Sequence, residues 1–235
     1  MKFRNTSLIS LCLLTLGQVF AIAQTSVPAD QTVTVNAMGP VTGPSGDKYF
    51  NVEGKAKGKY ACFGLIKFNT ASLKEGLDKK FGPGKYQIST IILEMNQSNA
   101  KFTAGGGIKV YYSADAKVDP AKLKYPFDAK SNSLAASSIA AISFTPAAMP
   151  TLSAVTINKD NKSAKKPPRP ETHRDAIDLS KGAGSKLLNS TVLSGGIITL
   201  ILAEGDNNVA ATWSGKSPVG LNKPPRLSVV AGPKR

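Results

Sequence analysis

Residues 60–68, YACFGLIKF, are the stretch that decides the fold. Alternating positions of this stretch form two sets of side chains, and both sets are largely apolar: Tyr60, Cys62, Ile66 and Phe68 in one, and Ala61, Phe63, Leu65 and Lys67 in the other. A strand with one face in water alternates apolar and polar residues, whereas a strand buried on both faces is apolar throughout. The stretch therefore predicts a central strand of a β-sheet.

Similar short apolar segments recur along the chain and are bounded by Gly, Pro, Asn or Ser. The chain holds 21 glycines and 15 prolines and shows little helical periodicity, which is typical of an all-β sandwich or barrel. We predict further strands at Thr32–Asn36, Lys48–Val52, Lys85–Met95, Ile108–Ser113, Leu152–Ile157, Ile197–Ala203, Asn208–Trp213 and Arg226–Ala231. Because residues 197–202 (IITLIL) are continuously apolar, we place them in the core.

The segment Lys85–Met95 changes the phase of its apolar positions between Ile88 and Ile91. A β-bulge produces such a slip, and burial on both faces would also explain it. Two short helical turns are also predicted, one at Leu73–Lys80 with Ser72 as its cap and one running from Ser180 to Leu188. Glycines weaken both turns, so we interpret them as crossover pieces of a sandwich and not as a helical layer.

The first residues have the three parts of a secretory signal peptide. Lys2 and Arg4 give a basic start, residues 8–16 are apolar, and Ala21-Ile22-Ala23 fits the small-residue cleavage pattern. The apolar run is shorter than the roughly 20 residues that a membrane-spanning helix needs, and no later stretch is long enough. We predict cleavage near Ala23 and a secreted, periplasmic or cell-surface protein.

Removal of residues 1–23 from the 235-residue chain leaves 212 residues, for which we predict one β-sandwich domain over residues 24–235. The part at about 119–172 carries little strand signal and is predicted to be an irregular insert. A Pro-rich run at 165–170 is the best candidate for a domain boundary. The strands predicted after it are too few to fold alone, so we interpret this run as a loop inside the domain.

The formal net charge is +15, and it falls to +13 after cleavage because Lys2 and Arg4 are lost and no acidic residue is. Such a charge suggests an anionic partner, either an acidic polysaccharide, nucleic acid or a membrane surface, with general solubility as the alternative. The basic residues are spread out, and eight lysines fall within residues 55–85. Cys62 is then the only cysteine, so no intramolecular disulfide can form, and we predict a buried, inert thiol.

The residue types exclude several classes of active site. His173 is the only histidine, so a site with several His ligands is excluded, and a single cysteine excludes a zinc ribbon. Neither a G-x-S-x-G elbow nor a P-loop nor an H-E-x-x-H motif is present. A polysaccharide lyase is the best enzymatic alternative, because such enzymes neutralise a uronate and abstract a proton with Tyr, His or Lys. None of their paired motifs is recognised here, so we predict a non-catalytic protein.

Both halves of the chain resemble one known family. The pieces that carry the resemblance are Phe68-Asn69-Thr70, Ile88–Leu93, Asp178-Leu179-Ser180, Gly196 with Thr199-Leu200, and Pro225-Arg226-Leu227-Ser228-Val229. In this order they are similar to DNRLRE-type, disaggregatase-related domains of secreted proteins, over roughly residues 31–115 and 174–231. Asn69 stands where that family has Asp, and its Trp/Glu-rich middle segment is absent here. The resemblance implies a jelly-roll sandwich similar to carbohydrate-binding modules, with a non-catalytic role and an acidic polysaccharide as ligand.

The stretch KKPPRPETHR (165–174) is the most unusual loop in the chain. Its prolines hold it extended, so it is either a basic binding loop on the rim of the sandwich or only a connector. Together with two aromatic residues it supplies the candidate ligand-binding residues: Lys165, Lys166, Arg169, His173, Arg174, Tyr111 and Trp213. Tyr111 is expected on the outer side of its strand, whereas Trp213 belongs either to the core, which we favour, or to a sheet edge.

We therefore expect an exported surface or extracellular module that binds an anionic polysaccharide or cell-envelope glycan through basic residues. The alternatives are a structural surface protein without a specific glycan and a lyase-like enzyme. Nucleic acid is disfavoured by the export signal and by the lack of a recognition motif. No cofactor is expected. A structural calcium ion is an open alternative at GDNN (205–208), although a hairpin turn explains those residues more simply.

Overall fold

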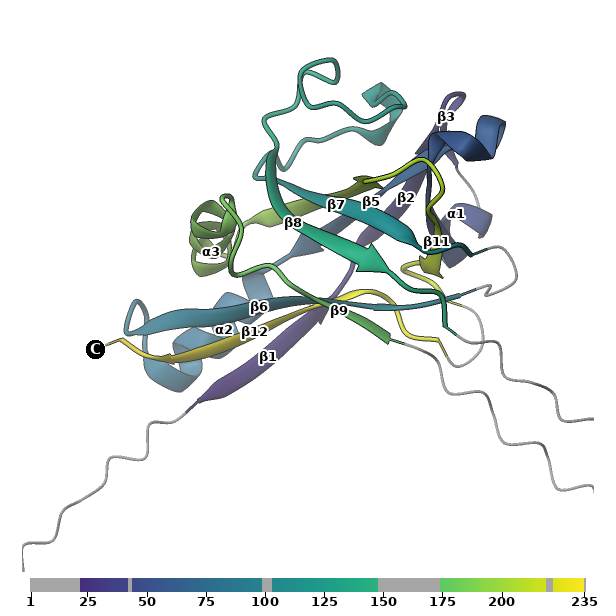
Figure 1. Ribbon diagram of the computed structural model, residues 1–235. Coiled ribbons are helices and arrows are strands. Elements are labelled where there is room, and N and C mark those ends of the chain that lie inside the picture. Colours follow the sequence, from purple (N-terminus) through teal and green to yellow (C-terminus); the bar gives the residue numbers. More distant parts are fainter. Residues whose placement is uncertain (1–21, 42–43, 99–102, 148–173, 219–221, 235) are drawn as a thin grey trace, which may run out of the picture.

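Two antiparallel β-sheets packed face to face form the computed structural model of this chain, which describes residues 22–41, 44–98, 103–147, 174–218 and 222–234 (Figure 1). The smaller sheet has the strand order β1-β12-β6-β9 and comprises β1 (Ala23–Pro28), β12 (Arg226–Pro233), β6 (Tyr86–Asn96) and β9 (Arg174–Asp178). The predicted all-β antiparallel sandwich is confirmed.

The larger sheet has the order β11-β4-β5-β10-β7-β8; in addition β2 pairs with β5, and β3 pairs with β2. Its strands are β2 (Gln31–Asn36), β3 (Gly39–Val41), β4 (Tyr49–Glu53), β5 (Cys62–Asn69), β7 (Gly106–Ser113), β8 (Ser137–Phe144), β10 (Ile197–Glu204) and β11 (Ala210–Ser214). The helices are short: α1 (Pro44–Lys48), α2 (Ala71–Phe81), α3 (Ser185–Ser194) and the 3₁₀ segments η1 (Lys55–Tyr60) and η3 (Pro120–Lys122).

Eight of these strands have the connectivity of a jelly roll. Numbered one to eight in chain order, β1, β5, β6, β7, β8, β9, β10 and β12 pair as 1-8-3-6 in the smaller sheet and as 2-7-4-5 in the larger one. The remaining strands belong to two insertions, β2 to β4 between the first and second strands and β11 between the seventh and eighth. The jelly-roll type expected from the sequence is therefore the observed topology.

The strand predicted from residues 60–68 is central, as expected. In β5, Leu65 pairs with Val33 of β2 on one edge and with Ile201 of β10 on the other. Ile66 and Phe68 face the smaller sheet and belong to the main core, whereas Phe63 and Leu65 face outward and belong to a second, smaller cluster. Burial on both faces explains why neither set of side chains in this strand is polar.

A β-bulge accounts for the phase slip in β6. On the partner strand β12, Val230 pairs with Thr90 and Ala231 pairs with Ile88, so Ser89 is the extra residue. Such an extra residue shifts the side chains that follow to the opposite face. The bulge alternative for this segment is confirmed.

Both predicted helices exist, but their predicted starts are wrong. Helix α2 follows Thr70 instead of Ser72, and its Leu73 and Leu77 are buried. Helix α3 begins at Ser185, five residues after the predicted cap, because the Ser180 hydroxyl oxygen instead accepts a hydrogen bond from the Ile91 backbone N–H at 2.8 Å. Figure 1 shows α2 and α3 together at one end of the molecule, away from β3 and α1.

The predicted irregular insert contains both a strand and a packed loop. Its described part runs from Asp119 to Ala147 and includes η3 and the edge strand β8, which pairs with β7. Residues 118–134 lie over the outer face of the larger sheet, where their apolar side chains complete the second cluster: Val118, Leu123, Tyr125, Phe127 and Leu134. The predicted strand Leu152–Ile157 lies outside the described residues. Within the described residues, no helix is long and apolar enough to span a membrane.

Candidate functional site

Three segments converge on the first residue of β5. Cys62 pairs with Asn36 at the end of β2 and also with Glu53 at the end of β4. The β2–β3 turn and η1 therefore lie at the same end of the sandwich as Cys62. We call this the lysine end and define it by Lys55, Lys57, Lys59 and Lys109.

Backbone contacts fix η1 against the turn that follows β10. The Ala56 N–H donates to the Asn207 carbonyl oxygen at 2.9 Å, and the Gly54 N–H donates to the Val209 carbonyl oxygen at 2.8 Å. Gly54 packs so closely there that a Cβ atom would lie 2.5 Å from the Asn207 carbonyl group. The three lysines of η1 are thus carried on an anchored segment. The Tyr60 ring is 62% exposed, and the Lys59 Nζ lies 5.3 Å from its centroid.

A cavity of about 310 Å³ opens beside η1, and we call it the basic pocket. Its walls come from η1, β7, β10 and the loop over the larger sheet, and its lining residues are Lys55, Lys109, Tyr111, Pro126, Phe127 and Ala203 to Asn207. A volume of this size is at the lower end of the range for small-molecule pockets. It can hold one or two sugar units or an acidic group of similar size.

The pocket has an aromatic wall held by packing. The Phe127 ring lies 5.0 Å from the Tyr111 ring and 5.3 Å from the Phe63 ring, at tilted angles of 57° and 59°. Tyr111 is on the outer face of its strand, as the sequence predicted, but the Phe127 loop half-buries it. Two lysines and two rings around one cavity can bind an anionic ring compound through charge and stacking.

The carboxylates near the pocket are engaged by groups other than lysine. The Tyr125 hydroxyl donates to Glu204 Oε1 at 2.9 Å, and burial, followed by this bond, raises the pKa of Tyr125. Asp206 accepts three backbone N–H bonds, from Gly107 at 2.5 Å, Asn208 at 2.9 Å and Val209 at 3.0 Å. These bonds, the one from Gly107 first, lower the pKa of Asp206. Asp206 is therefore ionised at neutral pH and holds the turn together.

Glu53 and Cys62 form the half-buried base of this end. Desolvation raises the pKa of Glu53, while the nearby Lys57 charge partly opposes that shift. The Cys62 thiol is fully buried, and its pKa is raised by burial first and then by the Glu53 charge. The sulfur is therefore protonated at neutral pH, and the predicted burial of this thiol is confirmed. Cys62 is therefore not an activated nucleophile.

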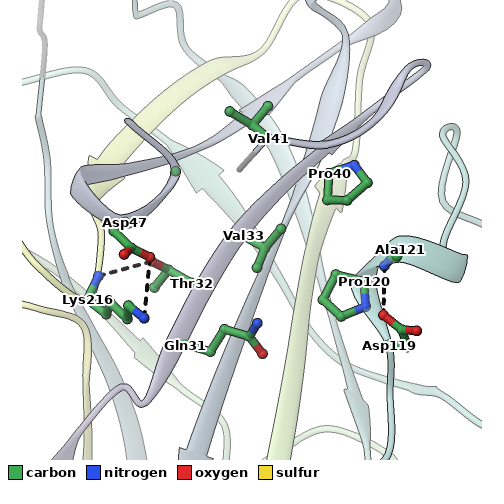
Figure 2. Close-up of a pocket in the computed structure, with 11 residues that line it drawn as sticks. Gln31, Thr32, Val33, Pro40, Val41, Asp47, Asp119, Pro120, Ala121 and Lys216 are labelled. Atoms are coloured by element: carbon green, nitrogen blue, oxygen red, sulfur yellow. Dashed lines mark hydrogen bonds and ion pairs between the residues drawn. The ribbon is translucent and has the colours of Figure 1, made fainter. Parts of the chain in front are cut away.

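A second cavity, of about 290 Å³, lies across β2 (Figure 2). Figure 2 shows Val33, Pro40, Val41 and Pro120 around it, with Asp47 on one side and Asp119 on the other. The Lys216 Nζ lies 3.4 Å from Asp47 Oδ1, and the Lys216 backbone N–H donates to the Thr32 hydroxyl oxygen at 3.0 Å. Because Lys216 pairs with Asp47 and Asp119 adds a further negative charge, this cavity is the weaker candidate for an anionic ligand.

Trp213 was among the predicted ligand-binding residues, and the structure corrects this. Its ring is completely buried, stacks on Phe50 at 5.3 Å and meets the Phe144 edge at 5.5 Å. Its indole N–H donates to Asp175 Oδ2 at 2.7 Å. The core alternative therefore holds, and Trp213 cannot stack on a sugar.

Arg174 is tied to the smaller sheet. Its guanidinium lies 3.1 Å from Glu94 Oε1, and its side chain is 58% exposed. The sequence predicted a cation held out in solvent, whereas Arg174 forms a partly exposed ion pair with the sheet. The other candidates of the same stretch, Lys165, Lys166, Arg169 and His173, lie outside the described residues. Of the predicted residues that the structure describes, only Tyr111 lies at the basic pocket.

The turn at 205–208 is not a hairpin turn, since β10 and β11 are not neighbours in the sheet. Because Asp206 gives its oxygens to three backbone N–H groups, its capacity for a calcium ion is largely used. Across the described ranges, no group of three or more His, Cys, Asp or Glu side chains is placed to hold a metal ion.

The lysines of η1 were visible in the sequence, as part of the run of eight lysines at 55–85, but that run gave no reason to choose among them. The spacing of Lys55, Lys57 and Lys59 with exposed Tyr60 is the signal that would have selected them. No protein-family model matches this chain, and no curated protein matches it in sequence. The resemblance to DNRLRE-type domains stays a prediction.

Proposed function

We propose that this chain is an exported, non-catalytic module of the cell surface or extracellular space that binds an anionic polysaccharide at the lysine end. The observation that carries the proposal is a cavity with an aromatic wall that Lys55 and Lys109 line, with Lys57 and Lys59 on the same short segment as Lys55. Within the described residues none of Lys55, Lys57, Lys59 and Lys109 forms an ion pair with a carboxylate. Their charges are therefore available to an anionic ligand.

The ligand chemistry follows from the residue types. Lysine amines attract carboxylate or sulfate groups as point charges, and Tyr111 and Phe127 offer ring faces against which a sugar ring can pack. Because Lys55, Lys59 and Lys109 are solvent-exposed and Lys57 is half-buried, most of the affinity comes from charge that salt can screen, so binding will weaken strongly as salt rises.

The test is a glycan array probed at two salt concentrations. At about 0.1 M salt the screening length is about 10 Å, and at about 1 M it is about 3 Å. We expect binding to polyuronates or sulfated glycans at the lower concentration and its loss at the higher one. Neutral glycans serve as the control. If no anionic glycan binds at either concentration, the proposal fails.

A lyase-like enzyme and a structural surface protein without a glycan are the alternatives. A lyase would release unsaturated uronate, which absorbs in the ultraviolet, so incubation with a panel of polyuronates distinguishes it. We expect no increase in absorbance. An increase would show that the protein cleaves its ligand, and it would replace the non-catalytic proposal by an enzymatic one.

A further inference from the structure

The tip of the lysine end carries two exposed apolar side chains that the basic pocket does not use. Met38 lies in the turn between β2 and β3 and is 89% exposed, and Tyr60 at the end of η1 is 62% exposed. They lie at the same end because Asn36 pairs with Cys62, so the turn after Asn36 runs beside the residues that precede Cys62. Neither residue lines the basic pocket.

Both side chains are held by ordered backbone. The Met38 N–H donates to Asn36 Oδ1 at 2.9 Å, and Gly39 has the positive φ of 109° that closes the turn. On the other loop, Gly58 has a φ of 61°, and the Ala61 N–H donates to the Gly58 carbonyl oxygen at 3.0 Å. The exposed positions of these side chains are therefore set by turn geometry and are not those of a frayed end.

The chemistry of this tip differs from that of a sugar site. Methionine is flexible and apolar and has no ring to stack on a sugar and no strong hydrogen-bonding group. Tyrosine has an apolar ring and a polar tip, which suits the boundary between lipid and water. Lys57 and Lys59 precede the tyrosine, and η1 itself contains no acidic residue. Exposed apolar side chains at the same end as these lysines match a bilayer surface with anionic headgroups.

We propose that Met38, Tyr60 and the neighbouring Lys57 and Lys59 form a tip that inserts into the headgroup region of an anionic phospholipid membrane. The lysine amines contact lipid phosphates while the Met38 and Tyr60 side chains enter the interface. The contact is peripheral and reversible, since two side chains enter and no segment spans. It does not rest on the polysaccharide proposal, because Met38 and Tyr60 lie outside the basic pocket.

The experiment is co-sedimentation with vesicles of phosphatidylglycerol and phosphatidylcholine in equal parts, beside vesicles of phosphatidylcholine alone. The wild-type protein should sediment with the first and stay in solution with the second. Met38→Ser with Tyr60→Ser should reduce the bound fraction at least five-fold. Leu187→Ser is the matched control, because Leu187 is 51% exposed on α3 at the other end, and it should bind like wild type. Equal binding by the double variant and wild type would overturn the proposal, as would equal binding to both kinds of vesicle.

A second readout measures insertion directly. Met38→Trp places a fluorophore at the tip, and the buried Trp213 gives a constant background that the wild-type protein reports. Adding anionic vesicles should shift the emission of the variant to shorter wavelength, and spin-labelled lipids should quench it. An unchanged spectrum would overturn insertion.

Polyuronate binding separates this proposal from the previous one. The Met38→Ser, Tyr60→Ser variant should bind polyuronate like wild type. If it loses polyuronate binding, the tip belongs to the glycan site and the membrane proposal is wrong. If the wild-type protein binds anionic vesicles but no glycan, the polysaccharide proposal fails and the membrane proposal stands.

Discussion

Both ends of this sandwich carry lysines and carboxylates. At one end the carboxylates pair with lysines, and at the other they accept hydrogen bonds from neutral groups. At the helix end, formed by α2 and α3, Lys74 forms an ion pair with Asp78, and the Lys181 Nζ lies 3.3 Å from Asp178 Oδ2. At the lysine end, Glu204 accepts from a tyrosine hydroxyl and Asp206 accepts from three backbone N–H groups. Among the described residues, none of the four lysines there forms a direct ion pair with a carboxylate.

This difference shows why the net charge of +15 is a poor guide to a binding site. An acidic residue forms a direct ion pair with a lysine only when its oxygens can reach that lysine. Exposed ion pairs contribute little to stability, so the pairing at the helix end serves mainly to cancel charge. We therefore expect anionic ligands to distinguish the two ends.

The largest expected effect is that of replacing Lys55, Lys57, Lys59 and Lys109 by alanine together. Each exposed ionic contact contributes about 0.2–1 kcal/mol, so four contribute about 1–4 kcal/mol. Affinity for a polyuronate should fall roughly five-fold to several-hundred-fold, since about 1.4 kcal/mol is ten-fold. Isothermal titration at about 0.1 M salt measures this loss, and the unfolding midpoint checks that the fold is intact.

The matched control removes the same charge from the helix end. Replacing Lys79, Lys85, Lys181 and Lys186 by alanine also lowers the net charge by four. We expect the affinity of this variant to stay within about two-fold of wild type, because long-range attraction is screened beyond about 10 Å at 0.1 M salt. Equal losses in the two variants would mean that net charge alone drives binding.

Glycine substitutions test whether the lysine end is as rigidly anchored as its contacts imply. In Gly54→Ala the new Cβ would lie 2.5 Å from the Asn207 carbonyl and from the Asp206 carbonyl oxygen, so η1 must move away from that turn. We expect a loss of about 1–3 kcal/mol in the free energy of unfolding, measured by urea denaturation. A neutral result would show that η1 can shift without cost.

At the helix end the same substitution should have the opposite sign. Gly76 lies inside α2, and a Cβ there would meet nothing within 4 Å. Gly76→Ala should raise the free energy of unfolding by about 0.5–1 kcal/mol, because alanine is the better helix former. If this variant were also destabilised, the contrast in packing between the two ends would be lost.

The smallest effect concerns pH and Glu53. Burial raises the pKa of Glu53 above its ordinary value of 4.5, so the folded protein holds this proton more tightly than the unfolded chain does. Glu53 therefore favours the fold below about pH 4.5, and that contribution is lost as the pH rises through the folded pKa. Glu53→Gln should remove this loss and gain less than about 1 kcal/mol over wild type near pH 7. Urea midpoints at pH 4, 5.5 and 7 measure the difference, and a gain that does not depend on pH would contradict the assignment.

The sandwich itself could be predicted from the sequence because its strands are buried on at least one face. The apolar runs in β5 and β10 and the phase slip in β6 each have a direct structural cause. The cover over the outer face could not be predicted. Its anchors, Tyr125 and Phe127, stand in a polar loop without periodicity, and only the face beneath them explains why they are apolar.

The site was less predictable than the fold. Sequence reasoning chose the Pro-rich stretch 165–174 and missed η1, because it judged basic residues by local density. The folded chain separates the lysine run at 55–85, with Lys55, Lys57 and Lys59 at one end and the lysines of α2 at the other. Lysines that are close in sequence therefore lie at opposite ends of the fold. Only the register of β5 with β2 and β4 shows that Lys55, Lys57 and Lys59 lie at the lysine end.

Lysine footprinting tests the central claim most directly, because it needs no substitution. The protein is acetylated with and without a saturating polyuronate, and mass spectrometry reports the modification of each lysine. We predict that Lys55, Lys57, Lys59 and Lys109 become protected, while Lys79, Lys85, Lys181 and Lys186 react as before. Equal protection at both ends, or protection confined to the helix end, would contradict the account.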